Sequence, residues 1–378
     1  MKPVVIAGYK RSPFHFAHKG MLVKKRPDDL AADVVRGLID SSGVDPAGIE
    51  DLIMGCAFPE GEQGFNMARI VGLLADLPIS VAGVTVNRFC GSSMQSIHIA
   101  AGAIQMNAGD AFICAGVESM SRIPMGGFNP MPNADLFEKN EGAYMSMGET
   151  AENLAEKYQI PREEQEALAI ASHTKAAAAR EDGKFKGEII AIECDGETVE
   201  EDGCIRPGTN AEGLSGLDPA FDAEGTVTAG TSSPLTDGAS AVLVTTEEYA
   251  KANNLEILAR IKSAAVAGCQ PEIMGYGPVV SSVKALERAG ISMVDIDVIE
   301  LNEAFAVQAL ACVRELSIDL DKMNIDGGAI ALGHPLGATG ARITGKAAQL
   351  LHRDGKRYAL ATQCIGGGQG ISTVLEAA

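Results

Sequence analysis

Residues 84–93 read VTVNRFCGSS, and no other part of the chain says as much about its architecture and chemistry. A β-branched run ends at Cys90, and Gly-Ser-Ser then opens a helix-like stretch from Met94 to Asn107. This order predicts a thiol at the turn between a strand and a helix, where first-turn amides and the helix dipole favour a negative charge. Such a setting lowers a cysteine pKa from about 8.5 to roughly 3.5 to 7.5. We therefore expect Cys90 to be an acidic nucleophile; the alternative is a small buried apolar residue, as most free cysteines are.

Composition narrows the class of protein. The chain has 378 residues, of which 46% are hydrophobic and 21% charged, so it has enough material for two or three core-forming units. Aromatic residues make up only 4% and Trp is absent, which predicts an aliphatic core. The net charge of -19 argues against a nucleic-acid partner, although a few cations and helix amides can still hold a small anion.

The eight cysteines indicate a compartment rather than a metal site. None of them forms a Cys-x-x-Cys pair, so we expect no zinc. Met1 leads directly into an apolar run without a signal-like segment, which favours a reducing, cytoplasmic setting over disulfides. No apolar stretch approaches the length of about 18 residues that would span a membrane.

The sequence contains an internal repeat. Residues 35–58 and 282–305 share one order of events: a helix ending at glycine, a short acidic linker, a β-branched strand and then a loop. The strand before Cys90 has a counterpart at residues 323–325, again followed by a glycine-containing turn and a helix. Strands that alternate with helices imply parallel sheets covered on both faces. We therefore expect an α/β fold of two similar halves, with helices packed between their sheets.

A long insertion interrupts the first half. Its sequence changes from Pro, Met and Gly-rich to strongly helical and then to acidic and Gly-rich, which is typical of a loop domain that covers a ligand; a purely structural cap is the alternative. We expect residues 1–118 and 225–253 to form the N-terminal half, 119–224 the loop domain, and 254–378 the C-terminal half.

Three later loops follow apolar strands, where catalytic groups are expected in such a fold. They are NEAFA at 302–306, GGAIALGHPLGATGAR at 327–342, and CIGGGQG at 364–370. A site shared between the halves would combine loops from both.

These loops supply a set of catalytic parts. His334 is followed by Pro335, which restricts the backbone of the histidine. We therefore expect the imidazole to lie in the loop rather than buried in a helix, where it could take a proton from Cys90. Cys364 offers a second thiol that could give or accept a proton. The amides of Gly366 to Gly368 and of Cys90 could form an oxyanion hole, in which one donor is worth about 2.7 to 4 kcal/mol of barrier. Taken singly, each has a structural alternative: a surface or core histidine, tight turns, or a packed cysteine.

At these residues the chain resembles the thiolase family, and the resemblance runs from Val4 to the last strand. The Cys90 segment and the three later loops each match a family signature. The resemblance implies a duplicated five-layered fold with a loop domain that covers coenzyme A (CoA), assembled as a homodimer or homotetramer. It implies no permanently bound cofactor and no metal, with CoA as a cosubstrate.

The resemblance also implies a reaction. Cys90 attacks the keto carbon of a 3-ketoacyl-CoA, acetyl-CoA leaves as a carbanion that Cys364 protonates, and a new CoA thiol takes the acyl group; the reverse is a Claisen condensation. His334 activates Cys90 and helps to bind the thioester oxygen, for which Asn302 positions a water. The amides of Cys90 and Gly366 hold the tetrahedral oxygen.

For the substrate, the resemblance implies contacts from the loop domain and its neighbours. Ser233 would contact the pantetheine arm, Met274 would line the acyl pocket, and Met147 would lie beside the substrate. Asp218 stands where many family members have an arginine near the nucleotide of CoA, which shifts that duty to Arg206, Lys184 or Lys186.

One departure bears on the reaction catalysed. Acetoacetyl-CoA-specific thiolases usually carry histidine before a Met-Gly pair, and here Ser146 precedes Met147 and Gly148. This favours a degradative 3-ketoacyl-CoA thiolase of fatty-acid β-oxidation. An acetoacetyl-CoA-specific acetyltransferase remains an alternative, as does a non-catalytic acyl-CoA-binding protein.

Overall fold

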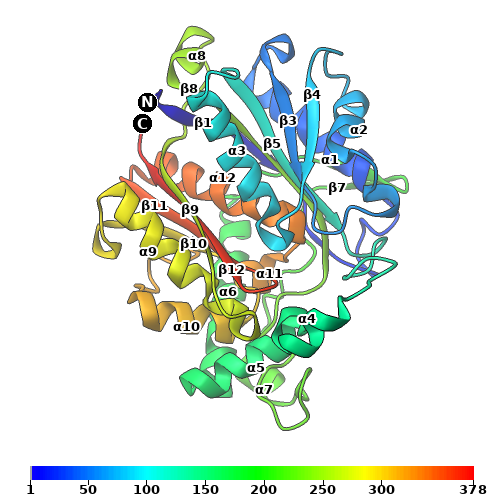
Figure 1. The fold of residues 1–378 in the computed structure, drawn as a ribbon, viewed down its shortest axis with the longest axis vertical. Helices are drawn as coiled ribbons and strands as arrows, with labels where there is room; N and C mark the ends of the chain where they lie inside the picture. Colours follow the sequence, from blue (N-terminus) through cyan, green and yellow to red (C-terminus); the bar gives the residue numbers. More distant parts are fainter. Residues whose placement is uncertain (1) are drawn as a thin grey trace.

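A computed structural model describes residues 2–378, and its ribbon shows two strand-and-helix halves above a mostly helical segment (Figure 1). The strands are β1 (Val4–Arg11), β2 (His15–Phe16), β3 (Asp51–Gly55), β4 (Ala82–Val86), β5 (Ala111–Ser119), β6 (Ile192–Cys194), β7 (Glu197–Val199), β8 (Thr236–Thr246), β9 (Ala259–Gly268), β10 (Val298–Leu301), β11 (Tyr358–Ile365) and β12 (Gln369–Glu376). The helices are α1 (Pro27–Ser42), α2 (Met67–Leu74), α3 (Ser92–Gln105), α4 (Ala134–Lys139), α5 (Met147–Tyr158), α6 (Arg162–Glu181), α7 (Ala211–Ser215), α8 (Glu247–Ala252), α9 (Gly277–Ala289), α10 (Ala306–Leu316), α11 (Ala329–Leu332) and α12 (Leu336–Asp354).

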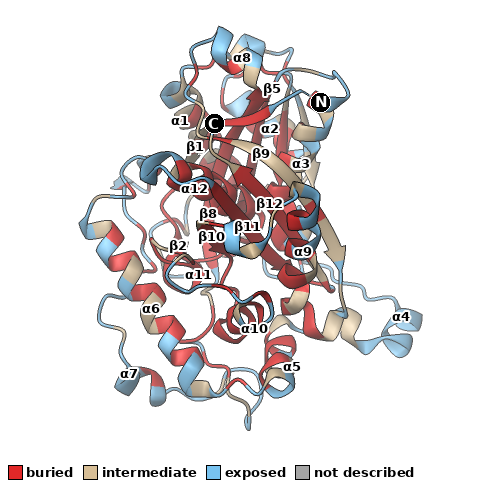
Figure 2. Ribbon diagram, turned by 90° about the vertical axis from the view of Figure 1, so that its left-hand side faces the viewer, coloured by how far each residue is buried: buried red, intermediate tan, exposed pale blue. Residues whose placement is uncertain are grey.

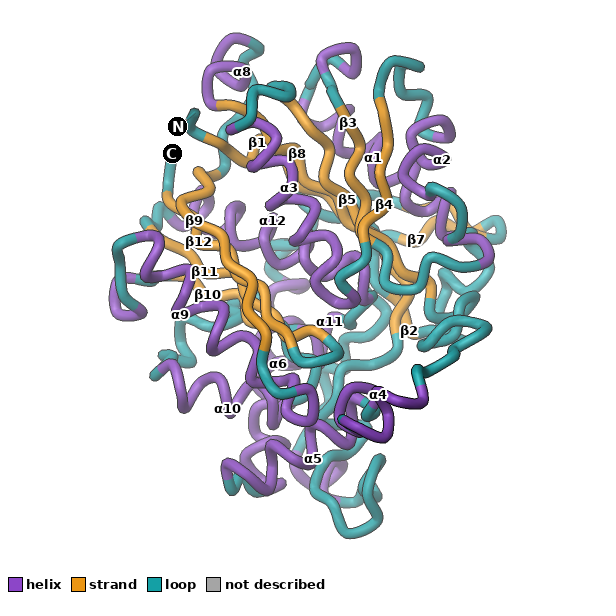
Figure 3. Tube along the Cα trace, in the orientation of Figure 1, coloured by secondary structure: helices purple, strands orange, loops and turns teal. Residues whose placement is uncertain are grey.

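The two halves repeat one topology, which confirms the predicted duplication. In the N-terminal half the strand order is β4-β3-β5-β8-β1, with β3 parallel to β4 and β5, and β8 antiparallel to its neighbours. In the C-terminal half the strand order is β10-β11-β12-β9, with β10 parallel to β11, and β12 antiparallel to its neighbours. An isolated parallel bridge from Ile299 to Met323 takes the place of the β4 pairing. Figure 3 shows the two groups of strands. A short pairing of β1 with β9 joins them into one 10-stranded sheet, in which β2 also pairs with β8.

Helix ends follow the repeat as well. α1 ends at Gly43 and α9 ends at Gly290, each with a left-handed backbone, at φ 71° and 69° respectively. Glycine is the residue that adopts this conformation without a Cβ penalty, so it stops both helices at the equivalent point.

Helices form three of the five layers. α3 and α12 contact each other and strands of both sheets, so they make the middle layer. α1 and α2 cover the outer face of the N-terminal sheet, and α9 and α10 lie outside the C-terminal sheet. Burial follows this order, because α12 and the central strands β5, β8 and β11 are buried while the outer helices show one exposed face (Figure 2).

The first turns of α3 and α12 approach so closely that only glycine fits between them. A Cβ on Gly340 would lie 2.2 Å from the backbone nitrogen of Met94, and one on Gly116 would lie 2.1 Å from the carbonyl oxygen of Gly337. The amide of Ala341 donates to Ser93 Oγ at 2.8 Å across the same contact. Both helices therefore begin at one place, with their N-termini side by side.

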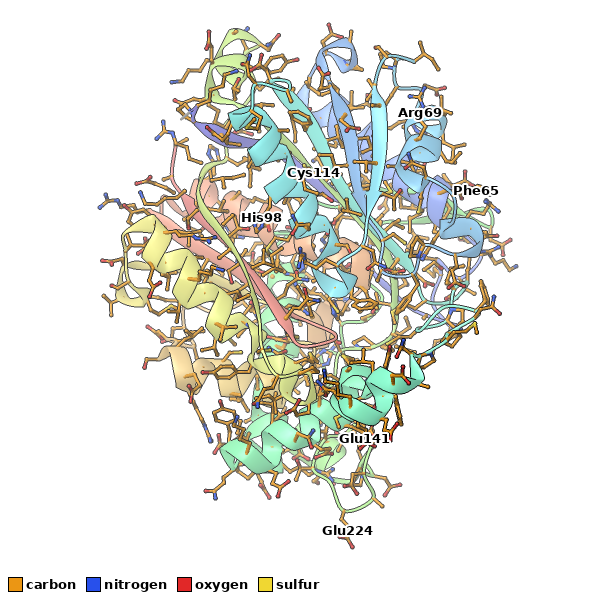
Figure 4. All side chains as sticks on the ribbon, in the orientation of Figure 1. Phe65, Arg69, His98, Cys114, Glu141 and Glu224 are labelled. Carbon is orange, nitrogen blue, oxygen red and sulfur yellow. The ribbon has the colours of Figure 1, made fainter. Side chains whose placement is uncertain are left out.

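Further along the middle layer, His98 ties α3 to the C-terminal sheet. Its Nε2 lies 2.8 Å from Thr373 Oγ1 on β12, and Figure 4 labels it in the interior of the molecule. Burial and the nearby Arg88 lower the pKa of His98 to about 4, so the imidazole is neutral. These contacts are those of a structural residue.

The insertion lies between β5 and β8 and holds α4 to α7 with the small hairpin β6-β7. Leu154 and Leu168 of α5 and α6 share a core cluster with Phe305 and Leu310 of the C-terminal half. The assignment of 119–224 as a separate loop domain stays a prediction, because this shared core gives the insertion no apolar core of its own on that side.

Buried ion pairs connect the insertion to β1 and α12. Arg11 of β1 binds Asp202 at 2.7 Å and Glu188 at 2.8 Å, both from the insertion. Lys346 of α12 binds the same Glu188 at 2.8 Å and Asp326 at 2.9 Å. All five side chains are at most 3% exposed. Removal of one partner therefore leaves a buried charge that water cannot solvate.

Changing Asp202 to Asn tests how much these ion pairs contribute to stability. The variant keeps the volume but removes the charge that faces Arg11, and we expect it to lower the free energy of unfolding by about 3 to 5 kcal/mol. The matched control is Asp195→Asn, which breaks the exposed Lys24 pair and should cost less than about 1 kcal/mol. Urea denaturation of both variants measures the difference, and equal losses would contradict the account.

Candidate active site

Cys90 lies in a 3-10 turn, Phe89–Gly91, between β4 and α3, at the predicted strand-to-helix junction. Phe89 holds a positive φ of 43°, which is an outlier for an aromatic residue and forms the sharp bend before the thiol. Asn87 supports the bend, because its Oδ1 accepts from the Phe89 amide at 2.8 Å. The carbonyl of Cys90 accepts from Gln363 Nε2 on β11, so the turn is bonded across the two halves.

The Cys90 thiol is not acidic, and that sequence-based expectation is wrong. Burial raises its pKa to about 12, because a thiolate would lose its hydration in a site that is only 9% exposed. The amides of Gly366 and of Cys90 itself bond to the sulfur and offset part of this effect, while the charge of Glu118 adds to it. The helix N-terminus is present, but desolvation outweighs it.

His334 stands as a neutral base with a defined tautomer. The Thr339 hydroxyl donates to the Pro335 carbonyl at 3.0 Å, so at 2.6 Å it accepts from His334 Nδ1. The proton is therefore on Nδ1, and Nε2 is the nitrogen that can accept a proton. Burial and the charge of Arg342 lower the pKa of His334 to about 3, which keeps the imidazole uncharged at rest.

Asn302 is the direct neighbour of that nitrogen. It follows β10, is fully buried, and places its Nδ2 3.3 Å from His334 Nε2. Its Oδ1 is buried without a hydrogen-bond partner in the described chain. Buried polar atoms are rarely left in this state, so Oδ1 is ready to hold a water or a substrate atom.

Cys364 and Gly366 come from the end of β11 and the turn after it. Burial raises the pKa of Cys364 well above its usual value, and the nearby Cys90 sulfur adds to the shift. Cys364 therefore stays a protonated thiol, within electrostatic reach of the Cys90 sulfur. Gly367 and Gly368 turn the chain at positive φ angles of 78° and 80°, which returns β12 alongside β11.

Among the predicted substrate contacts, Met147 and Ser233 lie near these groups. A Cβ on Gly366 would lie 3.4 Å from Met147 Sδ, so this half-buried methionine at the start of α5 borders the amide beside Cys90. Ser233 is half-buried and donates to the carbonyl of Ala304, two residues after Asn302 in the chain. Met274 is 2% exposed and shares a core cluster with Cys364.

The predicted phosphate contacts lie at the surface of the insertion. Arg206 is exposed and stacks its guanidinium 4.9 Å over the ring of Phe16, and its backbone amide donates to His173 Nδ1 at 3.1 Å. Lys184 already pairs with Asp182 at 3.1 Å. No contact in residues 2–378 joins these cations to the catalytic groups.

Sequence reasoning missed three residues that hold this site together: Glu118, Thr339 and Gln363. Glu118 had a signal, since it is the one charged residue in the otherwise apolar β5. A carboxylate inside a fully buried strand needs dedicated donors, and that alone would have marked it. Thr339 and Gln363 carry no such signal.

Comparison with known proteins agrees with this geometry. The thiolase N-terminal domain matches residues 4–248, and the thiolase C-terminal domain matches residues 255–377. The chain is 47% identical to a 3-ketoacyl-CoA thiolase of Bacillus subtilis, over 100% of both chains. It is 50% identical to one of Pseudoalteromonas translucida, over 100% of this chain and 99% of the relative.

Solved structures with the same fold include human mitochondrial 3-ketoacyl-CoA thiolase, which has also been solved in complex with CoA. That enzyme is 38% identical, with a TM-score of 0.92 over 100% of this chain and 99% of its own. The acetyl-CoA acetyltransferase of Bacillus anthracis matches with the same TM-score of 0.92, identity of 38% and coverage of 100% and 99%. The chain belongs to the thiolase family.

Proposed function

We propose that the protein is a 3-ketoacyl-CoA thiolase, which uses CoA to cleave a 3-ketoacyl-CoA into acetyl-CoA and a shortened acyl-CoA. The observation that carries the proposal is the set of two buried thiols, Cys90 and Cys364, close enough for one to raise the pKa of the other, together with the buried and neutral His334. A non-catalytic acyl-CoA-binding protein would need neither a second buried thiol nor a buried neutral imidazole. The names of its relatives favour the enzyme as well.

In the first half-reaction, Cys90 loses its proton to His334 Nε2 and attacks the keto carbon. The amides of Cys90 and Gly366 donate to the oxygen of the tetrahedral intermediate. The bond between the keto carbon and the adjacent carbon then breaks, and the electron pair goes to the acetyl-CoA enolate. Cys364 protonates that carbanion, and the shortened acyl group remains as a thioester on Cys90.

In the second half-reaction, the Cys364 thiolate takes the thiol proton of a new CoA. The CoA sulfur attacks the thioester on Cys90, and Cys90 leaves as a thiolate that takes back the proton from His334. Both thiols and the imidazole return to their neutral forms. Burial favours these uncharged resting forms, since each charged form is costly without water.

CoA binding is assigned to the insertion and its border with the C-terminal half. Met147 and Ser233 are assigned to the two sides of the reacting groups. Met274, which packs in the same apolar cluster as Cys364, is assigned to the wall of the acyl pocket. Arg206 presents an exposed cation on the Phe16 ring for the phosphates. Eight free cysteines fit a reducing cytoplasm, and the reaction fits fatty-acid β-oxidation.

Cys364→Ala separates the roles of the two thiols. Cys90 and His334 remain, so we expect iodoacetamide to alkylate Cys90 at close to the wild-type rate. Thiolysis should fall by about 10²- to 10⁴-fold, because the carbanion loses its proton donor. Deuterium exchange into the methyl group of acetyl-CoA in D₂O should fall with it. Normal exchange in the variant would remove Cys364 from the mechanism, and Cys90→Ser serves as the control that loses alkylation.

An acetoacetyl-CoA-specific acetyltransferase is the second candidate, because the Bacillus anthracis acetyltransferase shares the fold as closely as the human enzyme does. Thiolysis rates for 3-ketoacyl-CoA substrates of increasing chain length distinguish the two. We expect kcat/KM to be retained or to rise beyond the four-carbon substrate, since Met147 and Met274 offer an adaptable apolar wall. Activity confined to four carbons would reject the degradative assignment.

We also propose that the protein forms a homo-oligomer through the outer edge of β4. This strand ends the sheet, so one row of its backbone groups is unpaired. Exposed apolar side chains lie on β4, on α2 and beside them, and Phe65 among them is labelled at the surface in Figure 4. They are Phe65, Ile70, Leu73, Leu74, Ile79 and Val84. A patch of this kind beside an open sheet edge fits a second copy of the chain.

Ile79→Asp tests that interface. Ile79 is 78% exposed in the single chain, so the aspartate should not disturb folding, but it would place a charge in the apolar contact between copies. We expect light scattering after gel filtration to show a shift from oligomer towards monomer. The control is Met106→Asp, which changes an equally exposed residue at the end of α3 and should leave the mass unchanged. An unchanged mass in both variants would reject this interface.

A further inference from the structure

Glu118 is a buried carboxylate that the proposed mechanism does not use. It lies on β5 and is 1% exposed. Its Oε2 accepts from the amides of Ala57 at 2.8 Å and Gly337 at 2.9 Å. Its Oε1 accepts from Gln63 Nε2 at 2.7 Å and from the Phe58 amide at 3.3 Å, and the Cys56 thiol lies 3.7 Å away.

Three backbone amides and the Gln63 side chain donate to this carboxylate, and these four bonds favour its ionised form. Burial raises the pKa of Glu118, and the amides of Ala57, Gly337 and Phe58 with the Gln63 side chain act against that rise. Within residues 2–378 no lysine, arginine or histidine pairs with it.

On one side, the carboxylate controls the turn that carries the nucleophile. It fixes the amide of Ala57, whose carbonyl accepts from Asn87 Nδ2 at 2.9 Å. Asn87 Oδ1 in turn accepts from the amide of Phe89, the residue before Cys90. Ala57 and Cys90 also share one small apolar cluster.

On the other side, it controls the start of α12. Gly337 is the third residue after His334, and Oε2 of Glu118 binds its amide in the first turn of the helix. There is no room for this turn to shift, since a Cβ on Gly337 would lie 2.4 Å from the Val117 carbonyl and 2.9 Å from the Cys56 Cα. One oxygen atom thus bonds both to Ala57, in the loop packed against the Cys90 turn, and to Gly337, in the helical turn that follows His334.

We propose that Glu118 is a positioning residue, which locks the Cys90 turn and the His334 loop together and so sets the path along which the thiol proton passes to the imidazole. This proposal rests on the proposed function. In its ionised form Glu118 also adds to burial, the main cause, in raising the pKa of Cys90.

Glu118→Gln tests the proposal, because either orientation of the amide turns its NH₂ group towards two of the N–H donors. We expect kcat for thiolysis to fall by about 10²-fold, as for a small misplacement of reacting groups. KM for CoA should stay within about two-fold, since Glu118 contacts no residue assigned to CoA. The pH profile of Cys90 alkylation by iodoacetamide should move to lower pH, because the opposing charge is gone.

Glu188→Gln is the matched control: it removes a carboxylate of equal burial from the Arg11 and Lys346 pairs. It should lower the melting temperature while leaving the alkylation profile unchanged. If both variants lose activity in proportion to stability and neither shifts the profile, Glu118 is only structural and the proposal is wrong. Wild-type kcat in Glu118→Gln would also overturn it.

Gln63→Leu covers the case in which Glu118→Gln does not fold. It keeps the carboxylate but removes the Gln63 donor to it, together with the Gln63 bonds to the Ser119 amide and the Phe58 carbonyl, so kcat should fall by a smaller factor with the same KM. An unchanged kcat in a folded Gln63→Leu would count against the proposal. If the wild-type protein shows no thiolysis, the proposed function fails, and the alkylation profiles alone still decide whether Glu118 acts on Cys90.

Discussion

The contact between the first turns of α3 and α12 is the constraint on which the rest of the structure depends. Gly340 lies against the backbone of Met94, and Gly337 lies against Gly116, so the two helices can begin at one point between the sheets. Cys90 precedes the first helix and His334 precedes the second. Because the repeated halves place their helices in the same way, residues far apart in the chain meet where two helix N-termini converge. Side chains larger than glycine would force these turns apart.

Burial in this middle layer also determines the chemistry of the site. It raises the pKa of both thiols and lowers that of His334, so the resting site holds no charge on its reacting groups. Proton transfer then has to accompany bond formation, with amides of Cys90 and Gly366 ready for the developing negative charge. A solvated thiolate would react with many electrophiles; a buried thiol reacts where His334 can take its proton.

The sequence predicted most of the architecture, for physical reasons that can be traced to particular residues, and the roles of the catalytic set stay predictions. Helix stops at Gly43 and Gly290 and the strand-to-helix turn at Cys90 are local patterns, and they were readable before folding. The acidity expected for Cys90 was wrong because the helix dipole is visible in a sequence whereas desolvation is not. Thr339 and Gln363 were missed because their roles arise only from contacts made in the folded chain. The roles assigned to Arg206 and Ser233 stay predictions.

The proposed mechanism requires Cys90 and Cys364 to face each other in one site. The most direct test is cross-linking with dibromobimane, which joins two neighbouring thiols, followed by mass spectrometry of the digested protein. We expect a peptide pair linked through Cys90 and Cys364, which is lost when excess acetyl-CoA occupies the site. Cys90 modified singly, or linked to Cys56 in place of Cys364, would contradict it.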